Sequence, residues 1–360
     1  MKIRLILIIL AGFLMTSCGV EKQILEDILI AEVVGYDDAE SKKIKATVVV
    51  SVPQHGEQAN LGKEVYEAVS HDIKATRQQK NAKTPFPIVG GRLTVILYGE
   101  KLAGNGLNDY VDTYRRDPMV GRNLYLAIVH GKAEDVVKME PKLIKTPGVQ
   151  AKELIEQNIK TNLPNVDLHR YLYACHGKGI DPVLPLLETA GDQIRVKGIA
   201  LFKKDRYIGK YIPYEDGFLF KVLTENFKMG SYEIKWKENV FTDINNVESR
   251  VHYHISDANQ DPKVRIEVKL KASLLEVQGY DLGKAVDLNK IEARAEHVIG
   301  KKLNEMVTML QENNIDPIAI GNHAKSKTRN FNQEHWEKAY PYIPIEVDLD
   351  IEMIQTGIAE

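Results

Sequence analysis

The stretch Val264-Arg265-Ile266-Glu267-Val268-Lys269-Leu270-Lys271 alternates apolar and charged residues without interruption. Successive side chains of a strand point to opposite faces, so this pattern predicts a strand with one face in a core and the other in water. Residues 343–351 alternate in the same way, and their polar positions are acidic. The acidic row comprises Glu346, Asp348, Asp350 and Glu352. We expect it to pair across strands with a basic row that includes Lys269 and Lys271.

Between these two strands, the sequence predicts a long amphipathic helix over residues 288–313. Its apolar residues recur three or four positions apart, as a helix with one buried face requires. They are Leu288, Ile291, Ala295, Val298, Ile299, Leu303, Met306 and Leu310. Further strands are predicted over 194–202, 207–212 and 251–256. Residues 191–360 are therefore predicted to form an antiparallel-sheet domain packed on a long helix.

The preceding part of the chain, residues 18–190, mixes strands with helices. The predicted strands are 27–34, 47–52, 92–98 and 124–129. The predicted helices are 61–80 and 132–139, and a turn is predicted at 35–38. The fold class is thus α+β, with mixed sheets and flanking helices, and with a domain boundary near Gly191.

The composition limits the class of partner. The 360 residues carry a formal net charge of -2, and the sequence pI is about 6.6. A protein that binds nucleic acid through its phosphates usually has a clear basic excess, so no nucleic-acid partner is expected. After residue 18 there is no run of eighteen apolar residues, so no membrane-spanning helix is expected in that part of the chain.

The first eighteen residues have the pattern of an export signal. Lys2 and Arg4 precede an apolar run over 5–14 that is too short to span a bilayer. The small residues before Cys18 are typical of a bacterial lipobox, in which the cysteine is acylated and becomes the N-terminus. We therefore predict a lipoprotein signal peptide over 1–17 and a covalent lipid on Cys18, with palmitate among its acyl chains and no other cofactor. The alternative is an ordinary secretory signal with a chance cysteine.

Several residues could carry chemistry but lack a complete site. Cys175 and His176 are neighbours in sequence, yet no nucleophile elbow or oxyanion signature surrounds them. His252 and His254 lie on one side of a predicted strand, but the sequence supplies no third and fourth ligand for a metal. We predict no catalytic residues and no metal site. A secreted hydrolase stays open if the fold gathers perturbed carboxylates around His169, Cys175 or His176.

Five blocks, taken in order, resemble the GerAC-type lipoproteins, the C subunits of the nutrient germinant receptors of endospore-forming bacteria. They are the lipobox at Cys18, residues 91–100 with Gly106-Leu107, residues 116–118 with 124–127 and 131–133, residues 197–205 with Gly209, and a tail with Asp316, Gly321, Trp336, Tyr340-Pro341 and Gly357. Met15 stands where the family usually has leucine, and Asn330-Phe331-Asn332 lies near the place of a further tryptophan. The blocks cover nearly the whole chain.

The resemblance implies a non-enzymatic subunit of a membrane complex, which starts germination in response to small nutrients such as amino acids or sugars. Its partners would be an A-type subunit and a permease-like, multi-spanning B-type subunit. The chain would be a lipoprotein anchored on the outer face of the cell or inner spore membrane. Candidate contacts with the partner subunits are Arg116, Asp117 and Trp336. A lipid-anchored solute-binding protein of a transporter stays open as an alternative.

Overall fold

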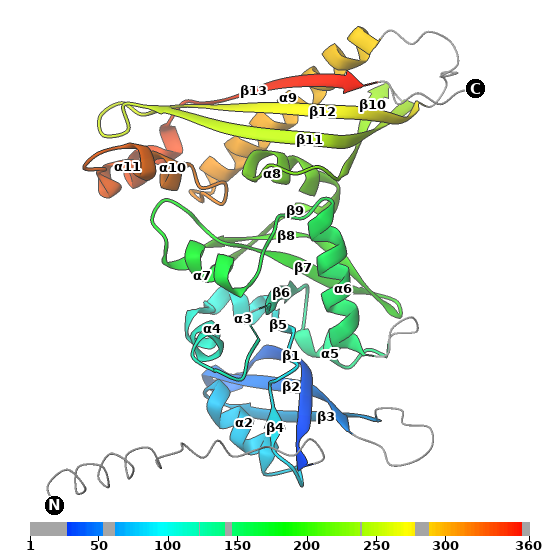
Figure 1. The fold of residues 1–360 in the computed structure, drawn as a ribbon. Helices are drawn as coiled ribbons and strands as arrows, with labels where there is room; N and C mark the ends of the chain where they lie inside the picture. The colour runs from blue at the N-terminus through cyan, green and yellow to red at the C-terminus, as the bar shows by residue number, and fades with distance from the viewer. Residues whose placement is uncertain are drawn as a thin grey trace, which may run out of the picture.

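The computed structural model describes residues 27–52, 62–121, 123–140, 146–237, 240–277 and 288–354, and within them the chain forms two sheets (Figure 1). The first sheet has nine strands. Their order is β3 (Gly62–Ser70), β2 (Lys43–Val52), β1 (Leu29–Ala39), β5 (Val95–Gly99), β6 (Tyr125–Val129), β7 (Val183–Ala190), β8 (Gln193–Lys203) and β9 (Arg206–Pro213), with β4 (Ile88–Val89) paired to β1. This mixed architecture confirms the predicted α+β class.

Helices cover both faces of the first sheet. β1, β5, β6 and β7 run parallel, and β5 and β6 are almost wholly buried, as strands covered on both faces are. The helices α3 (Glu100–Asn105) and α4 (Asn108–Arg115) follow β5 and contribute Leu102 and Val111 to one core. The helices α5 (Ala133–Val137) and α6 (Pro147–Lys160) follow β6 and contribute Val136 and Ile155 to the other. Two further helices, α2 (Ile73–Asn81) and α7 (Leu168–His176), pack with the first of these cores.

A buried helix, α8 (Gly217–Thr224), joins the two sheets, and it lies between them in Figure 1. All of its residues from 217 to 223 are buried, which is the expected pattern for a helix that is covered on every side. Lys221 is the one charged residue among them. Its ammonium donates to the carbonyl oxygen of Ile159 and lies 4.8 Å from the centre of the Phe227 ring, and burial lowers its pKa. No helix was predicted here from the sequence.

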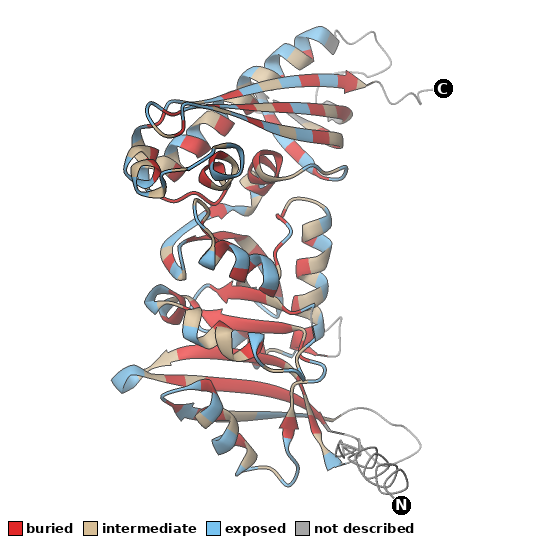
Figure 2. Ribbon diagram, turned by 60° about the vertical axis from the view of Figure 1, so that its left-hand side comes forward, coloured by how far each residue is buried: buried red, intermediate tan, exposed pale blue. Residues whose placement is uncertain are grey.

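The second sheet has the order β10 (Ser231–Lys237), β11 (Val240–Ser256), β12 (Lys263–Val277) and β13 (Ile345–Ile354). It is antiparallel except that β12 and β13 run parallel. Along β12, buried residues alternate with exposed ones, as predicted, and Figure 2 shows this alternation as bands along the strands. The predicted pairing of the acidic row is confirmed for Lys271, whose ammonium lies 2.8 Å from the carboxylate of Glu352 on the neighbouring strand. Lys269 faces Asp350 in the register, but its ammonium pairs with Glu267 of its own strand at 3.1 Å.

The predicted long helix is confirmed as α9 (Leu288–Glu312), which packs against the apolar face of the second sheet. It also covers the outer edge of β13. The backbone N–H groups of Val347, Ile351 and Met353 donate to side-chain oxygens of α9. Their acceptors are Asn304 (3.2 Å), Glu296 (3.1 Å) and Glu292 (2.8 Å). After α9 come α10 (Ile320–Lys327) and α11 (Gln333–Ala339).

Two local predictions near the N-terminus are wrong. Residues 62–70 form strand β3, and of the predicted helix 61–80 only residues 73–80 are helical. Val65 and Val69 fit a helical spacing, but this backbone pairs with β2 along its whole length and both side chains are 45% exposed. The partner strand, which a single segment does not reveal, decides the conformation. Residues 35–38, predicted as a turn, continue β1 instead and pair with β2.

The predicted domain boundary falls on the tight turn between β7 and β8. Strands β8 and β9, which the division at residue 190 assigns to the second domain, belong to the first sheet. The division of the chain into folding units at this point stays a prediction. No helix of the described residues is long and apolar enough to cross a membrane.

Candidate functional site

The carboxyl ends of β1, β5 and β6 lie side by side, where the helices after β5 and β6 leave towards opposite faces. In α/β sheets, such a switch point is the usual place for a ligand. Here the side chain of Asp37 fills it. Its carboxylate is buried and accepts hydrogen bonds from the backbone N–H groups of Ala133 (2.7 Å) and Glu134 (2.9 Å), at the start of α5. Burial raises the pKa of Asp37. The chain's own carboxylate therefore occupies the position that an anion would take.

The blocks 91–100 and 131–133 meet at this same place. Gly99 lies so close to Asp37 that an added Cβ would clash with its carboxylate, and Gly131 adopts a left-handed φ of 93°. At the rim, His130 Nδ1 lies 2.9 Å from Glu100 Oε2, and both side chains are partly exposed. These residues therefore pack together and close the carboxyl ends of β1, β5 and β6.

A second cluster joins the two halves of the molecule, and we call it the joint. It comprises residues 179–181 and 203–204 on one side and residues 314–322 on the other. The carboxylate of Asp181 accepts from the backbone N–H of Lys204 (2.8 Å), from that of Asp316 (2.9 Å) and from the Lys203 ammonium (3.1 Å). The backbone N–H of Asp181 in turn donates to the carbonyl of Asp316 (2.9 Å).

Asp316 is the buried acid of the joint. Its carboxylate accepts from the backbone N–H groups of Ile320 (2.9 Å) and Gly321 (2.7 Å). Burial raises the pKa of Asp316 to about 7, although these two hydrogen bonds and the Lys203 ammonium favour the charged form. The nearby carboxylate of Asp181 raises it further.

Two glycines allow the joint to close. Gly179 has a left-handed φ of 69°, and an added Cβ would meet the backbone of Gly321. The backbone N–H of Asn322 donates to the carbonyl of Gly179 (2.7 Å), and the indole of Trp336 packs over Gly321. Residues of the fourth and fifth sequence blocks thus converge here, although Asp181 and Asp316 are 135 positions apart. No sequence spacing could have indicated this contact.

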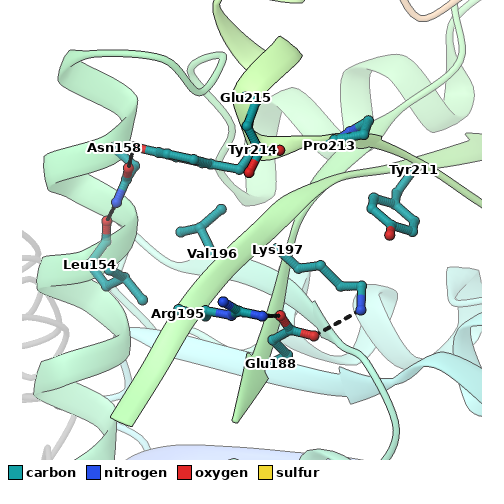
Figure 3. A pocket seen from close by; sticks show the side chains of 10 residues that line it. All are labelled: Leu154, Asn158, Glu188, Arg195, Val196, Lys197, Tyr211, Pro213, Tyr214 and Glu215. Atoms are coloured by element: carbon teal, nitrogen blue, oxygen red, sulfur yellow. Dashed lines mark hydrogen bonds and ion pairs between the residues drawn. The ribbon is translucent and has the colours of Figure 1, made fainter. Parts of the chain in front are cut away.

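A hollow lies beside β8, and we call it the β8 groove (Figure 3). Its volume is about 500 Å³, which is within the range of ligand sites. It is lined by Leu154, Asn158, Glu188, Arg195, Val196, Lys197, Tyr211, Pro213, Tyr214 and Glu215. Of these residues, only Lys197 belongs to the sequence blocks, as part of the fourth.

Charged groups converge on one side of the β8 groove. Glu188 Oε1 accepts from Arg195 Nε at 2.7 Å, and Glu188 Oε2 accepts from the Lys197 ammonium at 2.8 Å. The two cations lower the pKa of Glu188, so this carboxylate stays ionised. The ammonium of Lys197 also lies 5.6 Å from the centre of the Tyr211 ring. On the opposite wall, the hydroxyl of Tyr214 donates to Asn158 Oδ1 (2.7 Å), which fixes the ring against α6.

The three predicted partner contacts lie in different surroundings. Arg116 is exposed, directly after the end of α4, and donates to Asp112 of that helix at 2.6 Å. Asp117 accepts from Arg77 at 2.9 Å and so ties the end of α4 to α2. Trp336 is 1% exposed, so its side chain packs in the core next to the joint. The structure does not bring the three residues together, and contact with a partner stays a prediction for each of them.

The residues offered for a hydrolase do not converge either. His169 and His176 are exposed, and neither these residues nor Cys175 line the cavity of about 200 Å³ beside their helix. Burial raises the pKa of the Cys175 thiol to about 11, with Asp205 adding to the effect, so the thiol stays protonated at neutral pH. The described surroundings give no support to this alternative.

The remaining predicted sites concern metals and the lipid. Among the described residues, no group of three or more His, Cys, Asp or Glu side chains could hold a metal ion. His254 Nε2 lies 3.1 Å from Glu267 on the exposed face of the second sheet, and Tyr253 between the two histidines is buried. Cys18 lies outside the described residues, so its acylation stays a prediction.

Comparison with known families gives two matches in chain order. Residues 21–189 match the family described as "Spore germination protein N-terminal domain". Residues 197–357 match the family described as "Spore germination B3/ GerAC like, C-terminal". The two ranges meet on the hairpin of β7 and β8, and strands of the second range complete the first sheet.

Two individual proteins are similar over most of their length. The spore germination protein GerQC of Bacillus cereus is 29% identical over 367 residues, covering 100% of both chains. The crystal structure of the GerBC protein matches with a TM-score of 0.59 at 18% sequence identity, over 89% of this chain and 96% of that one. The second likeness shows a shared fold.

Proposed function

Because this chain belongs to the GerAC family of spore germination proteins, we propose that it is the lipid-anchored C subunit of a nutrient germinant receptor. The observation that carries the proposal is the match of both family domains, in order, over nearly the whole chain. In this role, the chain would assemble with an A-type subunit and a permease-like B-type subunit and would be needed for germination in response to small nutrients.

The lipid would keep the chain close to the membrane surface. Cys18 precedes Leu29, the first residue of β1, by eleven positions, so an acyl group there would hold the first sheet within about 40 Å of the membrane. Confinement to a surface raises the effective concentration of the chain around spanning partners. Two or three acyl chains make the anchoring stable, because one chain alone binds a bilayer only marginally.

The proposed role is non-catalytic. This role is supported by the state of two side chains that could otherwise take part in chemistry. The Cys175 thiol is held protonated, and the Asp37 carboxylate is engaged with the start of α5. The joint and the α8 helix are connections between the two sheets, which suits a subunit that transmits or supports an arrangement of partners.

The test uses the two cysteines of the chain as a matched pair. The tagged wild-type chain, Cys18→Ala and Cys175→Ala would each be produced in a spore-forming host, and spore membranes would be separated from soluble material. We expect the wild-type chain and Cys175→Ala in the membrane fraction and Cys18→Ala in the soluble fraction. Recovery of Cys18→Ala in the membrane at the wild-type level would refute the anchor.

The partners would be identified from the same material. After detergent extraction, we expect the wild-type chain to bring down an A-type and a permease-like B-type subunit. Purification with a transporter that has no role in germination, together with direct binding of an amino acid or sugar in isothermal titration, would instead favour a solute-binding protein.

A further inference from the structure

Besides the outer sides of the terminal strands β3 and β9, one inner segment of the first sheet lacks a partner strand among the described residues. β7 and β8 pair from Ala190 and Gln193 inward, but β9 joins β8 only from Gly198 onward. β9 ends at Pro213, whose nitrogen has no hydrogen to donate, and the chain then turns away into η3 (Tyr214–Asp216). Among the described residues, no strand pairs with Gln193–Lys197 on the side away from β7. This five-residue segment is the free edge of β8.

The alternation of the hairpin decides which backbone groups face outward. Only Gly191 and Asp192 lie between the paired residues Ala190 and Gln193. In such a two-residue hairpin the pair that flanks the loop is hydrogen-bonded, and every second residue after it points its N–H and C=O groups away from the partner strand. The backbone groups of Ile194 and Val196 therefore face outward, along the β8 groove.

The β8 groove lies against this free edge and is large enough for side chains of an added strand. Val196 is buried on the side of α6, next to Leu154, while Arg195 and Lys197 extend on the other face (Figure 3). A strand added to the edge would thus place alternate side chains against apolar and against basic surroundings. A second cavity of about 400 Å³ lies next to the groove and shares Tyr214 and Glu215 with it.

The charges of the β8 groove indicate the character of the occupant. Arg195 and Lys197 share one carboxylate, that of Glu188, on this side of the groove. Glu215 lies on η3, across the groove from them in Figure 3. An acidic side chain would therefore fit beside Arg195 and Lys197.

We propose that the free edge of β8 binds an extended acidic segment of another receptor subunit by strand addition. The segment pairs with the backbone groups of Ile194 and Val196, directs a carboxylate to Arg195 and Lys197, and places an apolar side chain between β8 and α6. Main-chain hydrogen bonds then supply affinity, and the two lining faces supply specificity. This inference rests on the proposed function, because its occupant is a partner subunit.

The first experiment is hydrogen–deuterium exchange of the full-length tagged chain, measured alone and in the detergent-extracted complex. We expect the backbone amides of residues 194 and 196 to exchange about tenfold more slowly in the complex. The amides of Val347 and Ile351 serve as a control, since α9 already covers them in the free chain. Protection of residues 194–197 in the free chain that rises with its concentration would identify a second copy as the occupant and overturn the proposal.

The second experiment reverses charge beside the free edge. The double variant Arg195→Glu/Lys197→Glu is expected to recover the partner subunits at least about tenfold less well than wild type. Arg206→Glu/Lys210→Glu, on the exposed part of β9, changes the charge equally and is expected to behave as wild type. A complex that forms with unchanged exchange at residues 194–197 would overturn this inference alone. Failure of the wild-type chain to bring down any spanning subunit would count against the proposed function and remove the inference with it.

Discussion

Two strand edges, one in each sheet, are treated in opposite ways. At β13, side chains of α9 accept hydrogen bonds from the backbone N–H groups of Val347, Ile351 and Met353. Asn304 contacts both the N–H and the carbonyl of Val347, so its amide imitates a neighbouring strand. At β8, residues 193–197 have no strand of the described chain on their outer side, and a hollow lies there instead.

The difference indicates at which strand edge a strand of another chain could be added. An uncovered strand edge is a template for further strands, and proteins usually cover or charge such edges. β13 follows that rule because a long helix runs beside it. The β8 edge carries basic side chains and has no covering strand among the described residues, so it is open to pairing with another strand.

The largest effect is expected at Gly198, where β9 crosses onto β8. An added Cβ would clash with the carbonyl oxygen of Ile212, so Gly198→Ala should force β9 away and lengthen the free edge. We expect a loss of about 3 kcal/mol in unfolding free energy, measured by urea denaturation. The matched control is Gly300→Ala in α9, where the added Cβ would meet no atom within 4 Å apart from the neighbouring backbone of the helix itself. It should gain about 0.5–1 kcal/mol, and equal effects of the two changes would contradict the role of Gly198.

A pH effect of intermediate size is expected at the joint, which holds the two sheets together. The folded pKa of Asp316 is about 7, above the ordinary value of 3.8, so the folded state binds this proton more tightly than the unfolded state. Its stabilising contribution is full below the ordinary value and is lost as the pH rises through 7. Between about pH 5.5 and about pH 8, the unfolding free energy should fall by about 2 kcal/mol more in wild type than in Asp316→Asn. Parallel pH profiles of the two proteins would show that Asp316 is not the titrating group.

A smaller effect is expected from opening the covered edge. Asn304→Leu removes the partners of the Val347 N–H and carbonyl at nearly constant volume, and should cost about 1.5 kcal/mol in thermal or chemical unfolding. Because β13 would then resemble the free edge of β8, light scattering should also detect self-association. Glu305→Leu on the exposed side of the same helix adds an equal apolar side chain away from the edge. If that control associates to the same degree, the effect comes from surface hydrophobicity and not from the edge.

The smallest effect is expected on the exposed face of the second sheet. Lys271 and Glu352 pair at 2.8 Å, but both side chains are well exposed. A double-mutant cycle with Lys271→Ala and Glu352→Ala should give a coupling of less than about 1 kcal/mol, and less still in high salt. A larger coupling would mean that the ladder of charges, rather than α9, protects this edge.

The sequence predicted those elements whose pattern is local. Alternation between Val264 and Lys271 and the helical spacing from Leu288 onward each depend on neighbouring residues, and both elements formed as expected. For residues 62–70 the local pattern led to a wrong prediction. Their apolar spacing suits a helix, but they pair with strand β2, which lies elsewhere in the chain.

The candidate sites depended on distant contacts and were mostly missed. Asp181 and Asp316 meet across 135 positions, and Glu188 meets Lys197 only because β7 and β8 form a hairpin with the correct register. The resemblance to a family located Lys197, Gly321 and Trp336 as members of its blocks. It did not indicate that they line a groove and a joint.

The sharing of one sheet between the two family domains has a practical consequence for dividing the gene. A fragment that stops at residue 190 would lack β8 and β9, so β7 would have no partner strand on the side where β8 lies in the full chain. The complementary fragment would begin with two strands that have no sheet to join. During synthesis, likewise, the first sheet cannot be completed until Pro213 has left the ribosome. An expression fragment of the first sheet should therefore extend to Pro213, and one of the second sheet should retain α8.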